Sequence, residues 1–432
     1  MFSIFVIKLE IMRFLFILVA FIGSLGAFSQ SFDDYFENKT LRLDYTFEGD
    51  HIHQTAALEA MKMIPEWNGR KVNPEKVLLQ GNGQIQMYDA ATDRLIYVES
   101  YSTLFQEWTT LEVAKKTQKK FENVFLVPFP KQKVNIKIVF FDKANTAHVL
   151  LNHFVDPKDT NIQKEPKKNE IETIIIHQSS HPNPIKIAVV AEGYSKKEMK
   201  TFKRKANAFV RQLFKHSAFK KYQERFQVIA VMPVSIDSGI TTPRKQQWKN
   251  TALQASFDTF DMDRYLTIQH VREMHNVLEG IPYHHIVVLA NSEVYGGGGI
   301  YNSYAVMSAQ IKKFARVTVH EFGHSFAGLA DEYFYPSDHL QQITKNNFEP
   351  WEQNITSLAN FETKWKRFLK KDTPIPTTYT EKNRPLGVYE GLKGNGVYIP
   401  GQVCRMKTNG AKDFCTVCSH AIEQLILFYT EE

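Results

Sequence analysis

Hydrophobic and polar residues follow two different patterns in the two halves of the chain. Between residues 41 and 155, short runs alternate apolar and polar side chains, and Gly, Asn and Asp separate them. Clear examples are residues 41–47, 84–88 and 134–141. Alternation with a period of two is typical of a strand with one buried and one exposed face. This half of the sequence therefore predicts an antiparallel β-sandwich.

Beyond residue 170 the apolar runs become continuous. Three such runs occur, at residues 185–190, 226–231 and 285–290. They are typical of strands buried on both faces. A helix from about residue 196 to 215 is expected between the first two, because Ser195 can cap it and Glu198 completes a capping box. Strands that alternate with helices indicate an α/β sheet.

A polar segment rich in Pro and Lys separates the two patterns. This segment, residues 156–170, predicts a linker or an exposed loop. We therefore expect a β-sandwich accessory domain at residues 31–155 and a second, α/β domain at residues 171–432. The fold class is mixed, α+β together with α/β.

The first thirty residues have a different character. An apolar run at residues 14–23 follows Met12 and Arg13, and small residues follow the run. These are the features of a secretory signal peptide, and the run is shorter than the about 20 residues that a membrane span needs. We expect residues 1–30 to be a signal peptide, with Met1 or Met12 as the start, and the mature chain to be secreted without a membrane span. An uncleaved N-terminal anchor is the alternative.

Composition adds little to this picture. The chain of 432 residues is 43% hydrophobic and 23% charged, with a formal net charge of +7, which is ordinary for a globular protein. The basic residues are interleaved with acidic ones and form no stripe with aromatic residues, so we expect no nucleic-acid partner. The sequence carries no signal for the oligomeric state.

The segment that carries chemistry is His320-Glu321-Phe322-Gly323-His324, which a stretch without Pro or Gly precedes. On a helix, residues four apart share a face, so the imidazoles of His320 and His324 can converge on one ion. Zinc suits them, since it binds imidazole nitrogen and prefers four ligands in a tetrahedron. Glu321 can then take a proton from a zinc-activated water as general base in peptide hydrolysis. The structural alternative is a histidine pair without a metal.

A third ligand is expected just after this helix. Gly328 stands where the helix would stop, and Asp331 and Glu332 follow it. This arrangement is similar to the metzincins, whose motif has a Gly three residues and a third ligand six residues after the second histidine. Here Gly328 and Asp331 come four and seven residues after His324, so the turn has one extra residue. We expect Asp331 to be the ligand, and Glu332 is the alternative or orients a histidine.

The chain resembles the IgA peptidases, a family of bacterial secreted zinc metallopeptidases. The resemblance is most specific in residues 320–333 and covers nearly all of the mature chain. Supporting segments are residues 32–50, 190–194, 404–406 and 414–418. It implies a metzincin-like zinc peptidase domain behind the β-sandwich, with one catalytic zinc.

The resemblance also implies roles for individual residues. It makes His320, His324 and Asp331 the zinc ligands. It makes Glu321 the base. Met406 becomes the counterpart of the methionine that lies in a tight turn beneath the metal of metzincins.

Two weaker signals lie near the motif. The glycine run at residues 296–299 is either an edge strand that aligns a peptide substrate by backbone pairing or a flexible loop. The phenols of Tyr333 and Tyr335 could hydrogen-bond an oxyanion, but we expect them to pack against the turn.

The three cysteines all lie near the C-terminus, at positions 404, 415 and 418. Because an exported chain meets an oxidising compartment, we expect a disulfide from Cys404 to Cys415 or Cys418. The alternative is a structural zinc site of the three cysteines and His420.

The sequence therefore predicts a secreted zinc endopeptidase that acts on proteins or peptides. The family name points to immunoglobulin A, or to other host glycoproteins, as substrate. Two alternatives come from other classes of protein. One is a cell-surface binding or adhesion protein that keeps the zinc fold without turnover. The other is a zinc amidase that acts on a non-protein amide such as a peptidoglycan cross-link.

Overall fold

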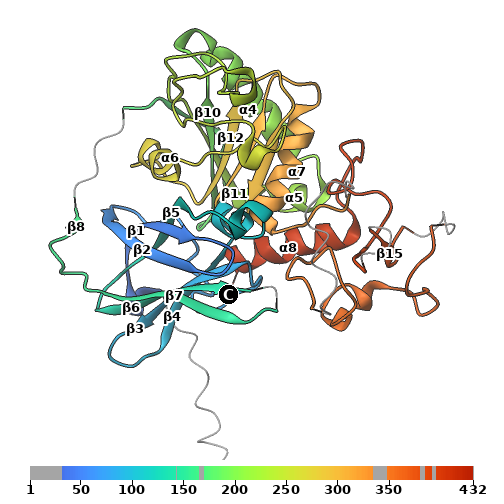
Figure 1. The fold of residues 1–432 in the computed structure, drawn as a ribbon, viewed down its shortest axis with the longest axis horizontal. Helices are drawn as coiled ribbons and strands as arrows, with labels where there is room; N and C mark the ends of the chain where they lie inside the picture. The colour runs from blue at the N-terminus through green and yellow to red at the C-terminus, as the bar shows by residue number, and fades with distance from the viewer. Residues whose placement is uncertain are drawn as a thin grey trace, which may run out of the picture.

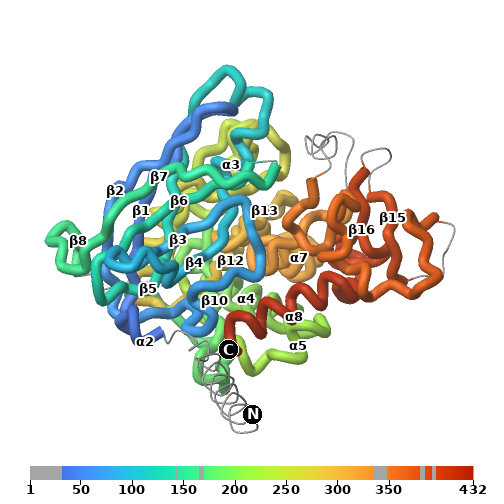
Figure 2. The backbone as a smooth tube through the Cα atoms, turned by 90° about the horizontal axis from the view of Figure 1, so that it is seen from below, coloured from blue at the N-terminus to red at the C-terminus, as the bar shows by residue number. Residues whose placement is uncertain are grey.

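The computed structural model describes residues 32–142, 144–164, 170–333, 348–379, 385–391 and 396–431. The predicted signal peptide at residues 1–30 lies outside them. Figure 1 shows a β-rich N-terminal domain, drawn in blue to teal, and a mixed α/β domain that follows it. In both Figure 1 and Figure 2, the segment around β15 (Tyr389–Glu390) lies on the side away from the blue sandwich, whereas the red helix α8 (Thr416–Thr430) extends back to it. Within the described ranges, no helix has the length and apolar character to cross a bilayer.

The N-terminal domain is built from two four-stranded sheets, as predicted. One sheet has the order β5-β1-β2-β8 and the other β4-β3-β6-β7. The strands are β1 (Phe36–Gly49), β2 (Gln54–Ile64), β3 (Gly83–Asp89), β4 (Leu95–Tyr101), β5 (Lys119–Pro130), β6 (Val134–Phe141), β7 (Ala147–Val155) and β8 (Ile162–Gln163). All pairs are antiparallel except β2 with β8. Short helices α2 (Phe32–Tyr35) and α3 (Leu104–Trp108) complete the domain, and β8 falls within the segment predicted as a linker.

The second domain is organised around one six-stranded sheet of order β13-β14-β12-β10-β11-β9. The strands are β9 (Thr173–His177), β10 (Ile185–Glu192), β11 (Phe226–Val231), β12 (His285–Ala290), β13 (Gly297–Ile300) and β14 (Tyr304–Ser308). The four central strands are parallel, and the edge strands β9 and β13 are antiparallel. The three predicted strands are β10, β11 and β12. The predicted helix is α4 (Met199–Leu213), and the capping box of Ser195 and Glu198 is formed just before it.

The two faces of the six-stranded sheet are covered differently. Ile187 and Val189 of β10 point to one face, where α4, α7 (Phe314–Ala327) and α8 (Thr416–Thr430) pack. Ala188 and Val190 point to the other face, in one hydrophobic cluster with side chains of the N-terminal sandwich. Alternating side chains of one strand therefore serve two layers, which explains its continuous apolar run. The accessory domain shares a core with the α/β domain.

The shared core buries polar residues that the strand pattern predicted as exposed. Arg42 and Asp44, on β1, form a buried ion pair with Nε and Oδ1 2.7 Å apart. Helix α6 (Val271–Val277) covers them, since Arg42 Nη1 donates to Asn276 Oδ1 at 2.9 Å. Arg272 of the same helix donates to the carbonyl oxygen of Tyr45 at 3.0 Å. These polar contacts fix the orientation of the sandwich on the sheet.

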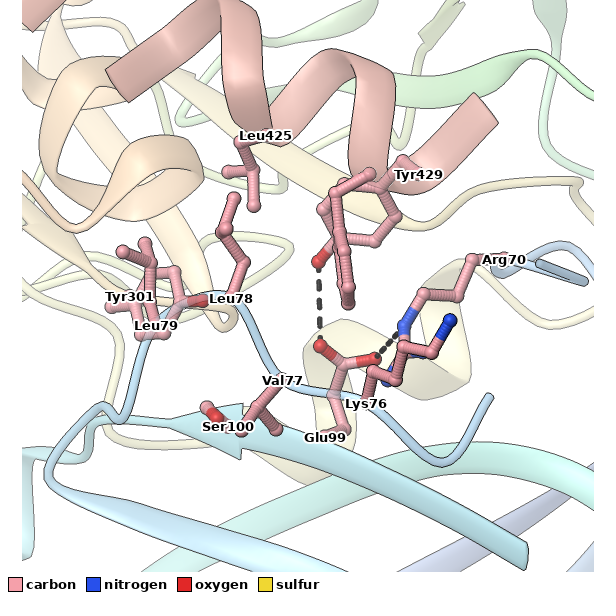
Figure 3. Close-up of a pocket in the computed structure, with 11 residues that line it drawn as sticks. Arg70, Lys76, Val77, Leu78, Leu79, Glu99, Ser100, Tyr301, Leu425 and Tyr429 are labelled. Carbon is pink, nitrogen blue, oxygen red and sulfur yellow. Dashed lines mark hydrogen bonds and ion pairs between the residues drawn. The ribbon is translucent and has the colours of Figure 1, made fainter. Parts of the chain in front are cut away.

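A second polar contact joins the sandwich to the C-terminal helix, around Glu99 of β4 (Figure 3). Arg70 Nε donates to Glu99 Oε2 at 3.3 Å, and the hydroxyl of Tyr429, on α8, donates to Glu99 Oε1 at 3.3 Å. Asn302 donates to the same oxygen at 2.9 Å. Three segments far apart in the sequence therefore meet at one carboxylate.

The remaining elements are short. They are α5 (Ser217–Lys221), β15 (Tyr389–Glu390), β16 (Tyr398–Ile399) and 3-10 turns at Glu112–Lys115, Lys196–Glu198, Gln223–Arg225, Pro243–Lys245, Thr259–Asp261, Phe361–Thr363 and Lys366–Phe368. Strands β15 and β16 form a two-stranded antiparallel ribbon. Helix α5 packs against α8.

Candidate metal centre

Helix α7 carries the histidine motif and ends where the sequence predicts. Its last residue is Ala327, and Gly328 caps it with a left-handed φ of 56°. The N–H of Gly328 bonds to the carbonyl oxygen of His324 at 3.0 Å. Glycine adopts this conformation without the penalty that a Cβ would bring. The chain therefore reverses at Gly328 and returns Asp331 towards the helix.

Three side chains converge beside α7: His320, His324 and Asp331, which we call the histidine cluster. The two Nε2 atoms are 3.2 Å apart, and Asp331 Oδ1 lies 3.0 Å from His320 Nε2 and 3.3 Å from His324 Nε2. Donor atoms about 2.0 Å from a tetrahedral zinc are separated by about 3.3 Å. The triangle therefore has the size of one face of such a coordination sphere.

The hydrogen bonds of the two rings fix which nitrogen faces the centre. His320 Nδ1 lies 3.0 Å from the carbonyl oxygen of Arg405, and His324 Nδ1 lies 2.5 Å from that of Leu329. A carbonyl oxygen only accepts, so each Nδ1 carries the proton and each Nε2 presents a lone pair. Two lone pairs and a carboxylate oxygen then face one another, and in the described part Asp331 Oδ1 has no hydrogen-bond donor. A cation between them removes the repulsion, so the residues fit a metal.

The charges around the histidine cluster also favour a cation at its centre. Burial lowers the pKa of His324, but Asp331 and then Glu321 outweigh it and raise that pKa to about 9. Burial raises the pKa of Glu321, and the two histidines offset only part of that rise. Without a metal, the cluster therefore holds a proton, and two carboxylates favour positive charge at its centre.

The glycine run lets α7 lie directly against the edge strand β13. A Cβ on Gly299 would come within 2.3 Å of the carbonyl oxygen of Glu321 and 2.7 Å of His324 Cβ. A Cβ on Gly297 would lie 3.1 Å from Glu321 Oε1. These glycines are strand residues that a helix approaches closely, so the flexible-loop alternative is wrong for them.

The outer edge of β13 is not entirely free for a substrate. The N–H of Gly297 bonds to the carbonyl oxygen of Arg264 at 3.3 Å, and Tyr265 forms a parallel bridge to Gly297. A Cβ on Gly298 would lie 3.1 Å from the ring of Tyr265. The chain's own residues therefore occupy one end of the edge that was considered for substrate pairing.

Met406, for which the resemblance implies a place beneath the metal, packs against α7 at Gly323. Its side chain is fully buried, and its sulfur would be 2.8 Å from a Cβ on Gly323, which stands between the two histidines. The carbonyl oxygen of Met406 accepts from the N–H of Glu332 at 2.9 Å. A larger residue at position 323 would require the side chain of Met406 to move.

Glu332 does not join the histidine cluster, so the proposal that it is an alternative ligand there is wrong. Its side chain turns to the other side of the chain, where Oε1 lies 3.0 Å from Cys418 Sγ and 3.1 Å from Asn354 Nδ2. Burial, and then the neighbouring Cys415, raise the pKa of Glu332 to about 8. The side chains of the adjacent residues Asp331 and Glu332 therefore belong to two different clusters.

Of the two tyrosines of the turn, Tyr333 lies within the described residues. The ring of Tyr333 stacks on that of His320, with centroids 6.0 Å apart and planes 24° apart. Packing of the ring against the turn stays a prediction. Tyr335 lies outside the described residues.

The three cysteines are buried and free, so the predicted disulfide is wrong. Cys404 Sγ and Cys418 Sγ are 3.6 Å apart, against the about 2.05 Å of a disulfide bond. His420 is also wrong as their partner, because its Nε2 is 2.8 Å from Arg367 Nη2. Glu332 occupies that place instead.

Two site residues were missed by sequence analysis, Tyr265 and Glu107. Burial and then Glu107 raise the pKa of Tyr265, and Glu321 is close enough to add to the rise. The hydroxyl of Tyr265 donates to the carboxylate of Glu107, on α3 of the N-terminal domain. The N-terminal domain therefore contributes to the wall of the site. No spacing links either residue to the motif, so the sequence offered no signal for them.

The fold and the site define the class: an α/β protein with a helix-borne cluster of two histidines and an aspartate that could hold a metal. Comparison with protein families agrees with it. A family model described as IgA Peptidase M64 matches residues 174–384, and one described as Peptidase M64 N-terminus matches residues 31–152. The chain belongs to this family, and it is a peptidase. Comparison with curated proteins gave no significant match.

Proposed function

We propose that this peptidase is a secreted zinc endopeptidase, with His320, His324 and Asp331 as zinc ligands and Glu321 as the general base. The observation that carries the proposal is the triangle of two Nε2 atoms and Asp331 Oδ1, with sides of 3.0–3.3 Å, on the helix that also bears Glu321. Zinc is the ion that matches imidazole and carboxylate donors at this size.

The residues around that ion have separate roles. A bound zinc supplies a Lewis acid that polarises a carbonyl and acidifies a water molecule. Glu321 accepts the proton of the attacking water and passes it to the amine that leaves. Its buried position raises its pKa, which makes the carboxylate a better base. The carbonyl oxygens of Arg405 and Leu329 hold the two imidazoles in the tautomer that leaves Nε2 free.

Substrate and location complete the proposal. The peptidase acts on proteins, and the family description favours immunoglobulin A or another host glycoprotein. The signal-peptide features of residues 1–30 support export of the mature chain. Family membership favours this function over the binding-protein and amidase alternatives.

The test compares the chain from residue 31 with its Glu321→Gln variant. Metal content and cleavage of immunoglobulin A and a denatured protein are measured on both, with peptidoglycan fragments as a second substrate class. We expect equal zinc in the two proteins and about 10²–10⁴-fold slower cleavage by the variant. Cleavage of peptidoglycan alone would favour the amidase. Zinc without cleavage of any substrate would favour the binding protein.

Export is tested separately. The full chain is expressed with its own N-terminus, and the protein found outside the cytoplasm is sequenced from its first residue. A mature N-terminus near residue 31 is expected. A retained N-terminus in the membrane fraction would establish the uncleaved anchor instead.

A further inference from the structure

A second group of metal-binding side chains lies on the other side of the Asp331 turn. We call it the thiolate cluster, and its members are Glu332, Cys404, Cys415 and Cys418. One ligand atom from each lies within 4.8 Å of all the others. Three separate segments supply them: the turn after α7, the turn that contains Met406, and the N-terminus of α8. The residues of the last two segments lie outside the ranges that the family models match.

Glu332 gives an independent sign that something is bound there. Its side chain is 1% exposed, and among the described residues it has no ion-pair partner. Oε1 has Cys418 and Asn354 beside it, but Oε2 is buried without a hydrogen-bond partner in the described part. A buried carboxylate oxygen without a donor costs free energy of folding unless a proton or a cation neutralises it.

Backbone donors and a helix N-terminus face the sulfurs of the thiolate cluster. The backbone N–H groups of Met406 and Cys415 both point at Cys404 Sγ, at 3.4 and 3.2 Å. Cys415 is the N-cap of α8, a helix of 15 residues, and Cys418 stands in its first turn. Backbone donors and a helix N-terminus both stabilise a thiolate over a thiol.

From this geometry we propose that the thiolate cluster binds a second zinc ion, through three sulfurs and one carboxylate oxygen. Zinc accepts such a set in a closed tetrahedral site. A disulfide between Cys404 and Cys418 would leave Cys415 unpaired and Glu332 without a cation. A network of neutral thiols would leave Oε2 of Glu332 without a donor. A metal uses all four side chains as ligands.

The second zinc ties together the parts that build the histidine cluster. Glu332 follows Asp331 directly, and its N–H bonds to the carbonyl oxygen of Met406, 2.9 Å away. The site therefore holds the Asp331 turn to the methionine turn and to α8. Its ligands are separate from those of the catalytic proposal, so each site can be tested without the other.

The experiment uses the mature chain and a variant in which His320→Gln and His324→Gln remove the histidine cluster. Zinc content is measured after native purification, and the metal environment is determined by X-ray absorption. We expect two zinc ions per chain in the unmodified protein and one in the variant. The remaining zinc should show sulfur neighbours at about 2.3 Å, three in number. Circular dichroism checks that the variant is folded.

Two results would overturn the proposal. One is a folded variant without zinc whose three thiols all react with an alkylating reagent on denaturation, or whose digest contains a cysteine cross-link. The other is a remaining zinc with only nitrogen and oxygen neighbours. A Cys418→Ser variant with intact histidines is the matched control, and it should lose the sulfur-ligated zinc. If that variant does not fold, the X-ray absorption spectrum of the histidine variant still shows whether sulfur atoms bind the remaining zinc.

Discussion

The histidine cluster and the thiolate cluster begin at adjacent residues, Asp331 and Glu332, yet they differ in exposure and in ligand type. The side chain of Asp331 is 33% exposed and that of His324 is 16% exposed. Glu332 is 1% exposed, and Cys404 and Cys418 are fully buried. Three protein ligands leave one coordination position for water and substrate, whereas four leave none. The comparison separates a site suited to catalysis from a site suited to holding the fold.

The strongest test of this difference exchanges one ligand at a time. Asp331→Asn should lower zinc affinity of the histidine cluster, and with it peptide cleavage, by at least about 100-fold. Glu332→Gln is the matched variant one residue later. It should change cleavage much less and reduce the unfolding temperature more. Zinc content, cleavage rate and thermal unfolding of the two variants are compared. Equal effects on cleavage would mean that the two clusters form one functional unit.

A chelator should remove the two proposed zinc ions at different rates. A chelator reaches the more exposed histidine cluster first, so cleavage should be lost early and return when zinc is added. The unfolding temperature should fall only later, when the buried cluster loses its ion, because a metal bound only to the folded state stabilises it. Activity, zinc content and thermal unfolding are followed over the same time course. Simultaneous loss of both ions would contradict the difference in exposure.

The sequence predicted those features that depend on local pattern. The alternation of apolar and polar residues at 41–47 predicted the sandwich. The continuous apolar run at residues 185–190 predicted the sheet of the α/β domain. Histidines four apart predicted two imidazoles that converge on one side of α7, and Gly328 predicted the end of that helix. Each of these follows from geometry within a few residues of chain.

The remaining features depend on contacts between distant segments. The direction of Glu332 could not be predicted because it is set by Asn354 and by cysteines over seventy positions away. Arg42 fits the polar face of a strand, but it is buried and donates to Asn276 of α6. Tyr265 and Glu107 meet across two domains. Tertiary packing determines these three features, and no spacing of residues along the sequence predicts such packing.

A smaller effect is expected from the packing that supports only the histidine cluster. Gly299→Ala puts a Cβ 2.3 Å from the backbone oxygen of Glu321, and backbone cannot move aside cheaply. We expect a loss of about 1–3 kcal/mol of stability and slower cleavage, with the sulfur-ligated zinc retained. Gly410→Ala is the control, since its Cβ would meet Thr408 Oγ1 at an ordinary 3.5 Å. Unchanged cleavage by Gly299→Ala would show that α7 does not need this close approach.

The smallest expected effect concerns Glu107 of the N-terminal domain. Through its contact with Tyr265, this domain borders the histidine cluster but not the thiolate cluster. Burial raises the pKa of Glu107 to about 7, and the hydrogen bond from Tyr265 offsets part of the rise. Between about pH 4.5 and pH 7 the folded chain therefore binds a proton that the unfolded chain has released, so this group's contribution to stability falls as pH rises through that window.

Glu107→Gln removes this titration while keeping an oxygen for the Tyr265 hydroxyl. The variant should gain about 2–3 kcal/mol of stability above pH 7, relative to the unmodified chain, and should lose the advantage below about pH 4.5. Thermal unfolding across pH 4–8 measures it, and the zinc of the thiolate cluster should stay unchanged throughout. A parallel shift of the two stability curves at every pH would mean that the carboxyl of Glu107 is not buried as a neutral acid.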